Sequence, residues 1–144
     1  MRPSTVLSGR FARMPWRATL RRISTTKRRL GWMLKPGDVV ELDLGMPVGS
    51  EAGLRRPAIV VTAGRVLSGK PNVIQVVPLA RTVRRSATEV IIDPDEENRL
   101  AASSSAQCQH LRSVAMTRVQ ERTGNVGPVV LGEVRETIVL LLDL

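Results

Sequence analysis

With 144 residues, the chain has room for one domain with a modest hydrophobic core. Its single cysteine, Cys108, excludes an internal disulfide and fits a reducing compartment. No apolar run approaches the roughly 20 residues that a membrane-spanning helix needs. We therefore expect a cytoplasmic protein with no membrane segment.

The net charge of +9 would suggest nucleic-acid binding, but the excess positive charge lies in one segment of the chain. Residues 1–32 hold nine of the 22 Lys and Arg residues and no Asp or Glu, so residues 33–144 set 13 basic against 13 acidic groups. Three interpretations are open for the basic segment: a nucleic-acid-binding arm, a targeting segment, or sequence outside the natural product, with Met33 as the true start. We expect a disordered or non-native extension over 1–32 and one domain over 33–144.

The first predicted element of the domain is a half-buried strand that follows the turn Pro36-Gly37-Asp38. Its apolar and polar positions alternate, with Val40, Leu42 and Leu44 on one face and Glu41 and Asp43 on the other. A long Gly-rich loop follows over residues 45–56, and its length without a pattern suggests a function.

A second strand is predicted over residues 57–62. The run Ala58–Val61 is short, apolar and rich in β-branched residues, which is typical of a strand buried on both faces. Pro57 suits the first position, where no ladder hydrogen bond is donated. Arg55 and Arg56 then stand at the edge of the sheet, held by the fixed φ of the proline. This rigid placement would suit phosphate binding, whereas a solvated arginine pair is the simpler interpretation.

The remaining pattern predicts a mainly β body that a helix closes. Strands are expected over residues 73–79, 87–93, 106–114 and 117–124, with a helical turn and loop over 94–105. From Pro128 the period changes to that of a helix, and one face carries four apolar residues: Leu131, Val134, Ile138 and Leu141.

Several kinds of site are absent from the sequence. One His and one Cys cannot form a zinc site, and there is no nucleophile elbow, Walker loop or dinucleotide-binding motif. The acidic cluster that follows the fourth strand fits a solvated turn better than a metal cage: Asp93, Asp95, Glu96 and Glu97. We expect neither a metal nor a cofactor.

Residues 34–144 resemble the MazF/PemK family of toxins in both order and spacing. The matching segments are KPGDVVELDL, GSEAGLRRPAIVV, VIQVVPL, and HLRSVA with the TGNVG turn and terminal helix. The resemblance implies a small SH3-like barrel of the CcdB/PemK type that works as a homodimer and is neutralised by a cognate antitoxin. It also implies sequence-specific, metal-independent cleavage of single-stranded RNA, through attack by the ribose 2′-OH.

Arg56 matches the catalytic arginine of the family, immediately before the proline of the second strand. A guanidinium keeps its proton at neutral pH, so its role would be to stabilise the charge of the pentacovalent phosphate. Arg55 is expected to contact RNA or solvent. Ser50 and Glu51 match the first loop of the family, which covers the substrate, and Glu51 is a candidate to orient Arg56.

The chain departs from the family at Ala80, where the family has its second catalytic residue, a threonine. Alanine has no hydroxyl with which to bind a phosphate oxygen, so we expect an impaired catalyst, changed naturally or by design. Thr82 would lie on the same face if the strand continued. It is either a substitute for the missing hydroxyl or an ordinary exposed threonine.

Further RNA contacts are expected from basic residues that follow the third strand and from residues within the strand predicted over 106–114. His110 stands where the family commonly has glutamine, and it is the only imidazole in the chain. The body has no aromatic residue, so bases would stack on guanidinium planes or on His110. The other candidate RNA contacts are Arg81, Arg84, Arg85, Arg112 and Ser113.

Three functions are compatible with the sequence. The first is an endoribonuclease toxin, and the second is a topoisomerase poison of the CcdB type, which shares the fold. The third is a catalytically silent barrel that binds RNA or antitoxin, which Ala80 favours. The arginine before Pro57 favours the nuclease, because a poison needs no positioned arginine.

Overall fold

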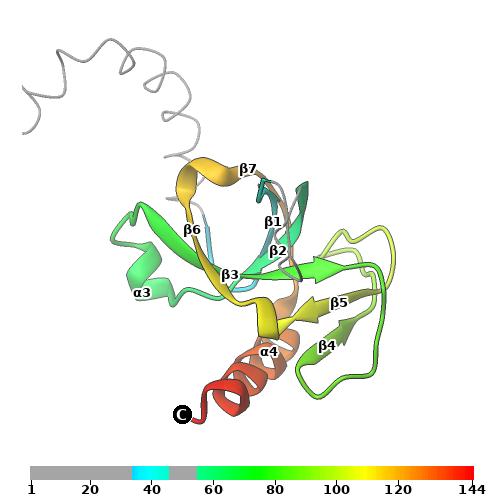
Figure 1. Ribbon diagram of the computed structural model, residues 1–144. Helices are drawn as coiled ribbons and strands as arrows, with labels where there is room; N and C mark the ends of the chain where they lie inside the picture. Colours follow the sequence, from blue (N-terminus) through cyan, green and yellow to red (C-terminus); the bar gives the residue numbers. More distant parts are fainter. Residues whose placement is uncertain (1–33, 46–54) are drawn as a thin grey trace, which may run out of the picture.

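The computed structural model describes residues 34–45 and 55–144, in which a curved antiparallel sheet is covered on one side by a C-terminal helix (Figure 1). The expected extension over residues 1–32 and the loop positions Ser50 and Glu51 lie outside the described residues.

Among the described residues the sheet contains seven strands, in the order β4-β5-β3-β2-β1-β7, with β6 paired to β3 off this path. The strands are β1 (Asp38–Asp43), β2 (Arg55–Val60), β3 (Val73–Ala80), β4 (Glu89–Ile92), β5 (Ser104–Gln107), β6 (Arg112–Ala115) and β7 (Val119–Asn125). Within residues 34–45 and 55–144, no pairing joins β7 to the opposite edge, so the sheet curls without closing. These observations confirm a mainly β, barrel-like fold with a C-terminal helix.

The central strands are buried on both faces, because a separate hydrophobic cluster lies on each side of the sheet. One cluster includes Val40, Ala58 and Val76, together with residues of β6 and β7. The other includes the alternate positions Ile59 and Val77, together with residues of the helix. This confirms that the second strand is buried on both faces, but the strand runs from Arg55 to Val60 instead of over 57–62, so both arginines belong to it. The prediction that the first strand is half-buried is wrong. Val39 lies on the face opposite Val40 and is only 1% exposed.

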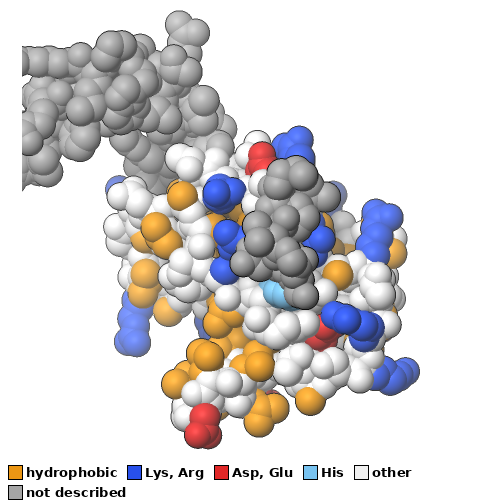
Figure 2. All heavy atoms as spheres, viewed as in Figure 1, with side chains coloured by type: hydrophobic (Ala, Val, Ile, Leu, Met, Phe, Trp, Pro, Cys, Tyr) orange, Lys and Arg blue, Asp and Glu red, His pale blue; other side chains and the backbone are white. Residues whose placement is uncertain are grey.

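The C-terminal helix, α4 (Gly127–Leu142), begins with Pro128 in its first turn, as expected. Leu131 and Val134 are buried, and Ile138 and Leu141 pack against the same cluster. Other apolar side chains gather on the surface at the C-terminal end of α4 (Figure 2); Leu140, Leu142 and Leu144 are among them. No helix within the described residues is long and apolar enough to cross a membrane.

The predicted strand over residues 106–114 is wrong. The chain instead forms β5, a 3-10 turn η1 (Cys108–His110), and then β6. Both strands pair with β3, β5 through Ala80↔Ser105 and β6 through Val76↔Arg112. The two registers differ, and the turn takes up the difference, so His110 does not lie on a strand. A second 3-10 turn, η2 (Met116–Arg118), likewise replaces the start of the expected strand over 117–124.

Two connections complete the fold. The short helix α3 (Gly64–Leu67) lies in the Gly-rich connection between β2 and β3. Residues 93–103, here called the β4–β5 loop, contain one turn, in which the N–H of Arg99 donates to the carbonyl of Asp95 at 3.2 Å. This agrees with the expected helical turn and loop.

Candidate active site

A pocket of about 630 Å³ lies where β2 begins and β3 ends. Its walls carry Arg55 and Arg56 from β2, Ala80 from β3, and Arg81 and Thr82 from the bend that follows β3. The structure therefore brings together five of the residues that were proposed from the sequence. Basic side chains also lie over the barrel strands in Figure 2, apart from the apolar side chains near α4.

Strand register places Arg56 and Ala80 on the same face of the sheet. The pairs between β2 and β3 run from Val60↔Val76 to Ala58↔Pro78. The pairing ends there, but because side chains alternate along each strand, Arg56 lies on the same face as Ala58, and Ala80 on the same face as Pro78. On β2, Arg56 alternates with Ala58 and Val60, whose side chains belong to the first hydrophobic cluster. Arg56 thus continues a row that is buried farther along the strand.

Arg56 is half-buried, and within residues 34–45 and 55–144 its guanidinium has one hydrogen-bond partner, which the sequence did not predict. Its Nη1 donates to Oε1 of Gln107 at 3.5 Å, a long hydrogen bond. Gln107 ends β5 and is only 8% exposed. A buried amide beside a guanidinium limits the orientations of both groups, so Arg56 is held from its backbone and from its head group.

Position 80 is next to a buried polar network. Ala80 pairs with Ser105 of β5, whose Oγ donates to Oε1 of Glu89 at 2.6 Å. Glu89 Oε2 also accepts from Gln109 at 2.6 Å and from Arg84 at 2.9 Å. Burial raises the pKa of Glu89, but these hydrogen bonds and the charge of Arg84 outweigh it, so the pKa lies below its ordinary value.

Thr82 does not lie on an extended strand, because β3 ends at Ala80. Thr82 was expected to share a face with position 80 only if the strand continued to it, and the strand does not. Its exposed side chain still belongs to the pocket wall, together with that of Arg81. Arg55, also exposed, pairs through its backbone with Asp43 of β1.

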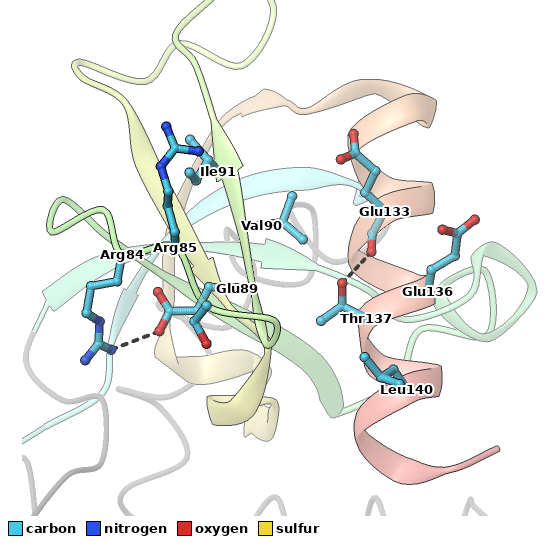
Figure 3. A pocket seen from close by; sticks show the side chains of 10 residues that line it. Arg84, Arg85, Glu89, Val90, Ile91, Glu133, Glu136, Thr137 and Leu140 are labelled. Atoms are coloured by element: carbon cyan, nitrogen blue, oxygen red, sulfur yellow. Dashed lines mark hydrogen bonds and ion pairs between the residues drawn. The ribbon is translucent and has the colours of Figure 1, made fainter.

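Arg84 and Arg85 lie away from this pocket. They line a separate depression of about 670 Å³ between β4 and α4 (Figure 3). There Arg84 is paired with Glu89, and the opposite wall carries the carboxylates of Glu133 and Glu136. Mixed charges of this kind suit a polyanion less well than the arginine-lined pocket does.

His110, Arg112 and Ser113 are not among the residues that line the arginine pocket. His110 lies half-buried in η1, and Arg112 begins β6 opposite Val76, on the face that Arg56 and Ala80 share. Ser113 lies on the other face, where its hydroxyl accepts from Gln75 Nε2 at 3.2 Å. Strand alternation therefore separates Arg112 from Ser113.

Two kinds of chemistry find little support in the described residues. Cys108 is 1% exposed, and burial, with a contribution from the charge of Glu89, raises its pKa to about 11. A thiol of this kind is a poor nucleophile. No group of three or more His, Cys, Asp or Glu side chains in 34–45 and 55–144 is arranged to hold a metal ion.

The pocket also contains residues that the sequence reasoning missed. Arg99 reaches it from the β4–β5 loop, Glu41 from β1 and Thr123 from β7. A strand pattern shows which residues share a face of one strand, but only the tertiary fold shows which strands and loops meet. Glu41 had been recognised as a polar position, yet nothing in its spacing related it to Arg56.

The chain was compared with known proteins. Residues 35–142 match the family described as PemK-like, MazF-like toxins of type II toxin–antitoxin systems. The chain is 31% identical over 116 residues to endoribonuclease MazF9 of Mycobacterium tuberculosis, covering 78% of this chain and 98% of the relative. The chain therefore belongs to the PemK/MazF-like toxin family, as the resemblance indicated.

Solved structures agree with this assignment. The fold is similar to that of MazF from Deinococcus radiodurans, with a TM-score of 0.66 and 28% identity over 77% of this chain and 97% of the other. It is also similar to a MazE–MazF structure from the same organism, with a TM-score of 0.59 and 26% identity over 77% and 96% of the two chains.

Proposed function

We propose that the chain is a toxin that cleaves single-stranded RNA without a metal ion. The ribose 2′-OH attacks the adjacent phosphorus and the bond from phosphorus to O5′ breaks, which leaves a cyclic phosphate and a 5′-OH. The observation that carries this proposal is the arginine pocket, which Arg56 and position 80 both line, in a chain that belongs to a family of toxins. The similarity to endoribonuclease MazF9 supports it.

Arg56 has the role of stabilising charge as it develops on the phosphate oxygens. Its strand position sets the direction of the side chain, and Gln107 is within 3.5 Å of the guanidinium; a donor that is preorganised in this way is effective in a transition state. Losing one such donor costs on the order of 10²- to 10³-fold in rate.

The same geometry leads us to expect weak activity from the chain as it stands. Ala80 offers the pocket a methyl group where the family has a hydroxyl. The hydroxyl of Ser105, opposite on β5, is fully buried and donates to Glu89, so it does not replace the missing group. The impaired catalyst and the second candidate, a silent barrel that binds RNA or antitoxin, therefore differ in whether a hydroxyl at position 80 restores cleavage.

We expect Ala80→Thr to raise the rate of RNA cleavage in EDTA by about 10²-fold, because it supplies a hydroxyl beside Arg56. The measurement follows a labelled single-stranded RNA on a gel and identifies the cyclic phosphate on the product. Ala87→Thr, the same change at an exposed position outside the pocket, is the matched control.

Adding Arg56→Ala to the Ala80→Thr chain should remove the gain. Equal rates for the unchanged chain and Ala80→Thr would contradict the role of position 80 and favour the silent barrel. If Ala80→Thr were active but insensitive to Arg56→Ala, the proposed role of Arg56 would be wrong.

We further propose that the toxin acts in the cytoplasm as a homodimer and is neutralised by a cognate antitoxin. Membership of a family of type II toxin–antitoxin toxins supports the antitoxin, and the MazE–MazF relatives support a complex of this kind. Sedimentation of the full chain at micromolar concentration should give twice the mass of one chain. A monomer under those conditions would contradict the dimer.

A further inference from the structure

Arg99 lies on the wall of the arginine pocket, although it is distant in sequence from Arg55, Arg56 and Arg81. It comes from the β4–β5 loop, and its side chain is exposed. Two ion pairs, Arg84–Glu89 and Arg122–Asp38, are found within residues 34–45 and 55–144, and Arg99 takes part in neither.

The backbone on both sides of Arg99 is fixed. Asn98 is 1% exposed, and its Oδ1 accepts from the N–H groups of Asp95 and Leu100, each at 3.0 Å. Its Nδ2 donates to the carbonyl of Asp93 at 2.9 Å. On the other side, Leu100 packs against the second hydrophobic cluster. Arg99 is thus the exposed residue between two anchored neighbours.

The loop is also held against β7. The N–H of Asn125 donates to the carbonyl of Glu97 at 2.9 Å. At Gly124, an added Cβ would lie 2.7 Å from the carbonyl oxygen of Asn98 and closer still to that of Glu97. This close approach fixes the position of the loop relative to the sheet that carries Arg56.

The backbone at Arg99 is left-handed, with a φ of 56°. Glycine adopts this conformation without steric cost, whereas a residue with a side chain loses roughly 1 kcal/mol or more. The local backbone therefore does not favour a residue with a side chain at position 99.

The charges in the pocket suggest what Arg99 binds. Among the described residues, the wall of the pocket carries four arginines (Arg55, Arg56, Arg81 and Arg99) and one carboxylate, that of Glu41. One scissile phosphate carries a single negative charge and cannot balance them. A strand of RNA carries one charge for every nucleotide, so neighbouring phosphates supply the remaining anions.

We propose that Arg99 binds a backbone phosphate of the RNA next to the one that is cleaved. This assignment depends on the proposed function, since it requires RNA in the pocket. A phosphate contact fixes the register of the strand and carries no sequence information. Arg99 would therefore position the substrate while Arg56 stabilises the transition state.

The test measures binding of a labelled, single-stranded RNA whose 2′-OH groups are methylated, so that it cannot be cleaved. Full-length wild type, Arg99→Ala, Arg99→Lys, Arg99→Gly and Arg56→Ala are titrated over a range of KCl concentrations. Arg65→Ala, at an exposed position on α3 outside the pocket, is the control. All variants keep residues 1–32, so that basic segment contributes equally to each.

Arg99→Ala should weaken binding about 10-fold or more, as expected for a lost hydrogen bond between charged groups. It should also reduce the slope of log K against log salt by about 0.7, the value for one phosphate on a single strand. Arg99→Lys should keep most of the slope. Arg99→Gly should bind as weakly as Arg99→Ala but unfold at an equal or higher temperature, because glycine relieves the left-handed backbone.

Equal slope changes in Arg99→Ala and Arg65→Ala would overturn the proposal. A loss that varies strongly with RNA sequence at an unchanged slope would also overturn it, since the side chain would then read a base. If Arg56→Ala weakens binding and Arg99→Ala does not, this inference fails and the proposed function stands. If no variant, Arg56→Ala included, differs from wild type, both fail.

Discussion

Glu89 is a buried carboxylate that three side chains satisfy at the edge of β4. Its side chain is 1% exposed, and Ser105, Gln109 and Arg84 all donate to it. Removing a charged acceptor from such a site leaves buried donors without a partner. The free energy lost in this way exceeds the net contribution of the hydrogen bonds themselves. Because Ser105 pairs with Ala80, the network also supports the floor of the pocket.

We expect Glu89→Gln to lower the free energy of unfolding by about 1–3 kcal/mol at pH 7, because the amide cannot accept all three bonds. Glu121→Gln, at an exposed position on β7, should change it little. Urea unfolding of both variants and the wild type measures the difference.

The effect of Glu89→Gln should depend on pH in a definite direction. The pKa of Glu89 is lowered from its ordinary value of 4.5 in the folded state. The stability that the ionised carboxylate contributes is therefore fully present above pH 4.5 and is lost as the pH falls through the folded pKa. The stability gap between wild type and Glu89→Gln should narrow below pH 4.5, and a gap that widens there would contradict the assignment.

At the scale of elements, the β4–β5 loop and β7 form the closest contact that supports the pocket. Gly124 allows the loop backbone at Glu97 and Asn98 to lie directly against the strand. Both sides of this contact carry residues of the pocket, Arg99 on the loop and Thr123 on the strand. The distance between Arg99 and Thr123 therefore depends on the glycine at position 124.

Gly124→Ala should destabilise the fold by about 1–3 kcal/mol, as overpacking does, because the new methyl group meets backbone that cannot rotate away. It should also weaken RNA binding by displacing the loop. Gly132→Ala is the matched control: on α4 an added Cβ meets nothing within 4 Å, so a gain of about 0.5–1 kcal/mol is expected. Thermal unfolding of the two variants measures both effects, and similar losses in both would contradict the role of Gly124.

Sequence patterns predicted elements well where one period dominates. The apolar run of β2 correctly predicted burial on both faces, and the helical spacing from Leu131 to Leu141 correctly predicted the packed face of α4. The pattern failed at residues 106–114, because an apolar alternation does not reveal that two segments share one partner strand. It also missed Gln107 and Arg99, whose roles depend on contacts between elements that are distant in sequence.

At the scale of the whole chain, a buried network of hydrogen bonds and one ion pair holds the start of β1 to β7. Asp38 is fully buried and accepts from the N–H of Lys35 at 2.7 Å and from Asn125 Nδ2 at 2.9 Å, while it pairs with Arg122 at 3.0 Å. Leu34 is 4% exposed and belongs to the first hydrophobic cluster. The folded unit therefore includes Leu34, and the family match begins one residue later.

Deleting residues 1–32 should leave a folded domain, because the contacts that fasten β1 remain and the remaining chain has balanced charge. Circular dichroism and thermal unfolding should match those of the full chain. Extending the deletion through Pro36 should destabilise the domain, since it removes Leu34 and the N–H donor of Lys35. An unfolded spectrum for the shorter deletion would contradict the proposed boundary.

Because Cys108 is buried, chemical modification of its thiol can report when the hydrophobic core opens. It is the only thiol among the 144 residues, and it lies in the second hydrophobic cluster against α4. With its pKa raised to about 11, it presents almost no thiolate at neutral pH while the core is intact. A thiol-trapping reagent can then modify only those molecules whose core has opened. The rate of modification, followed by mass, would count such openings without any label, and it would show whether RNA or an antitoxin makes them rarer.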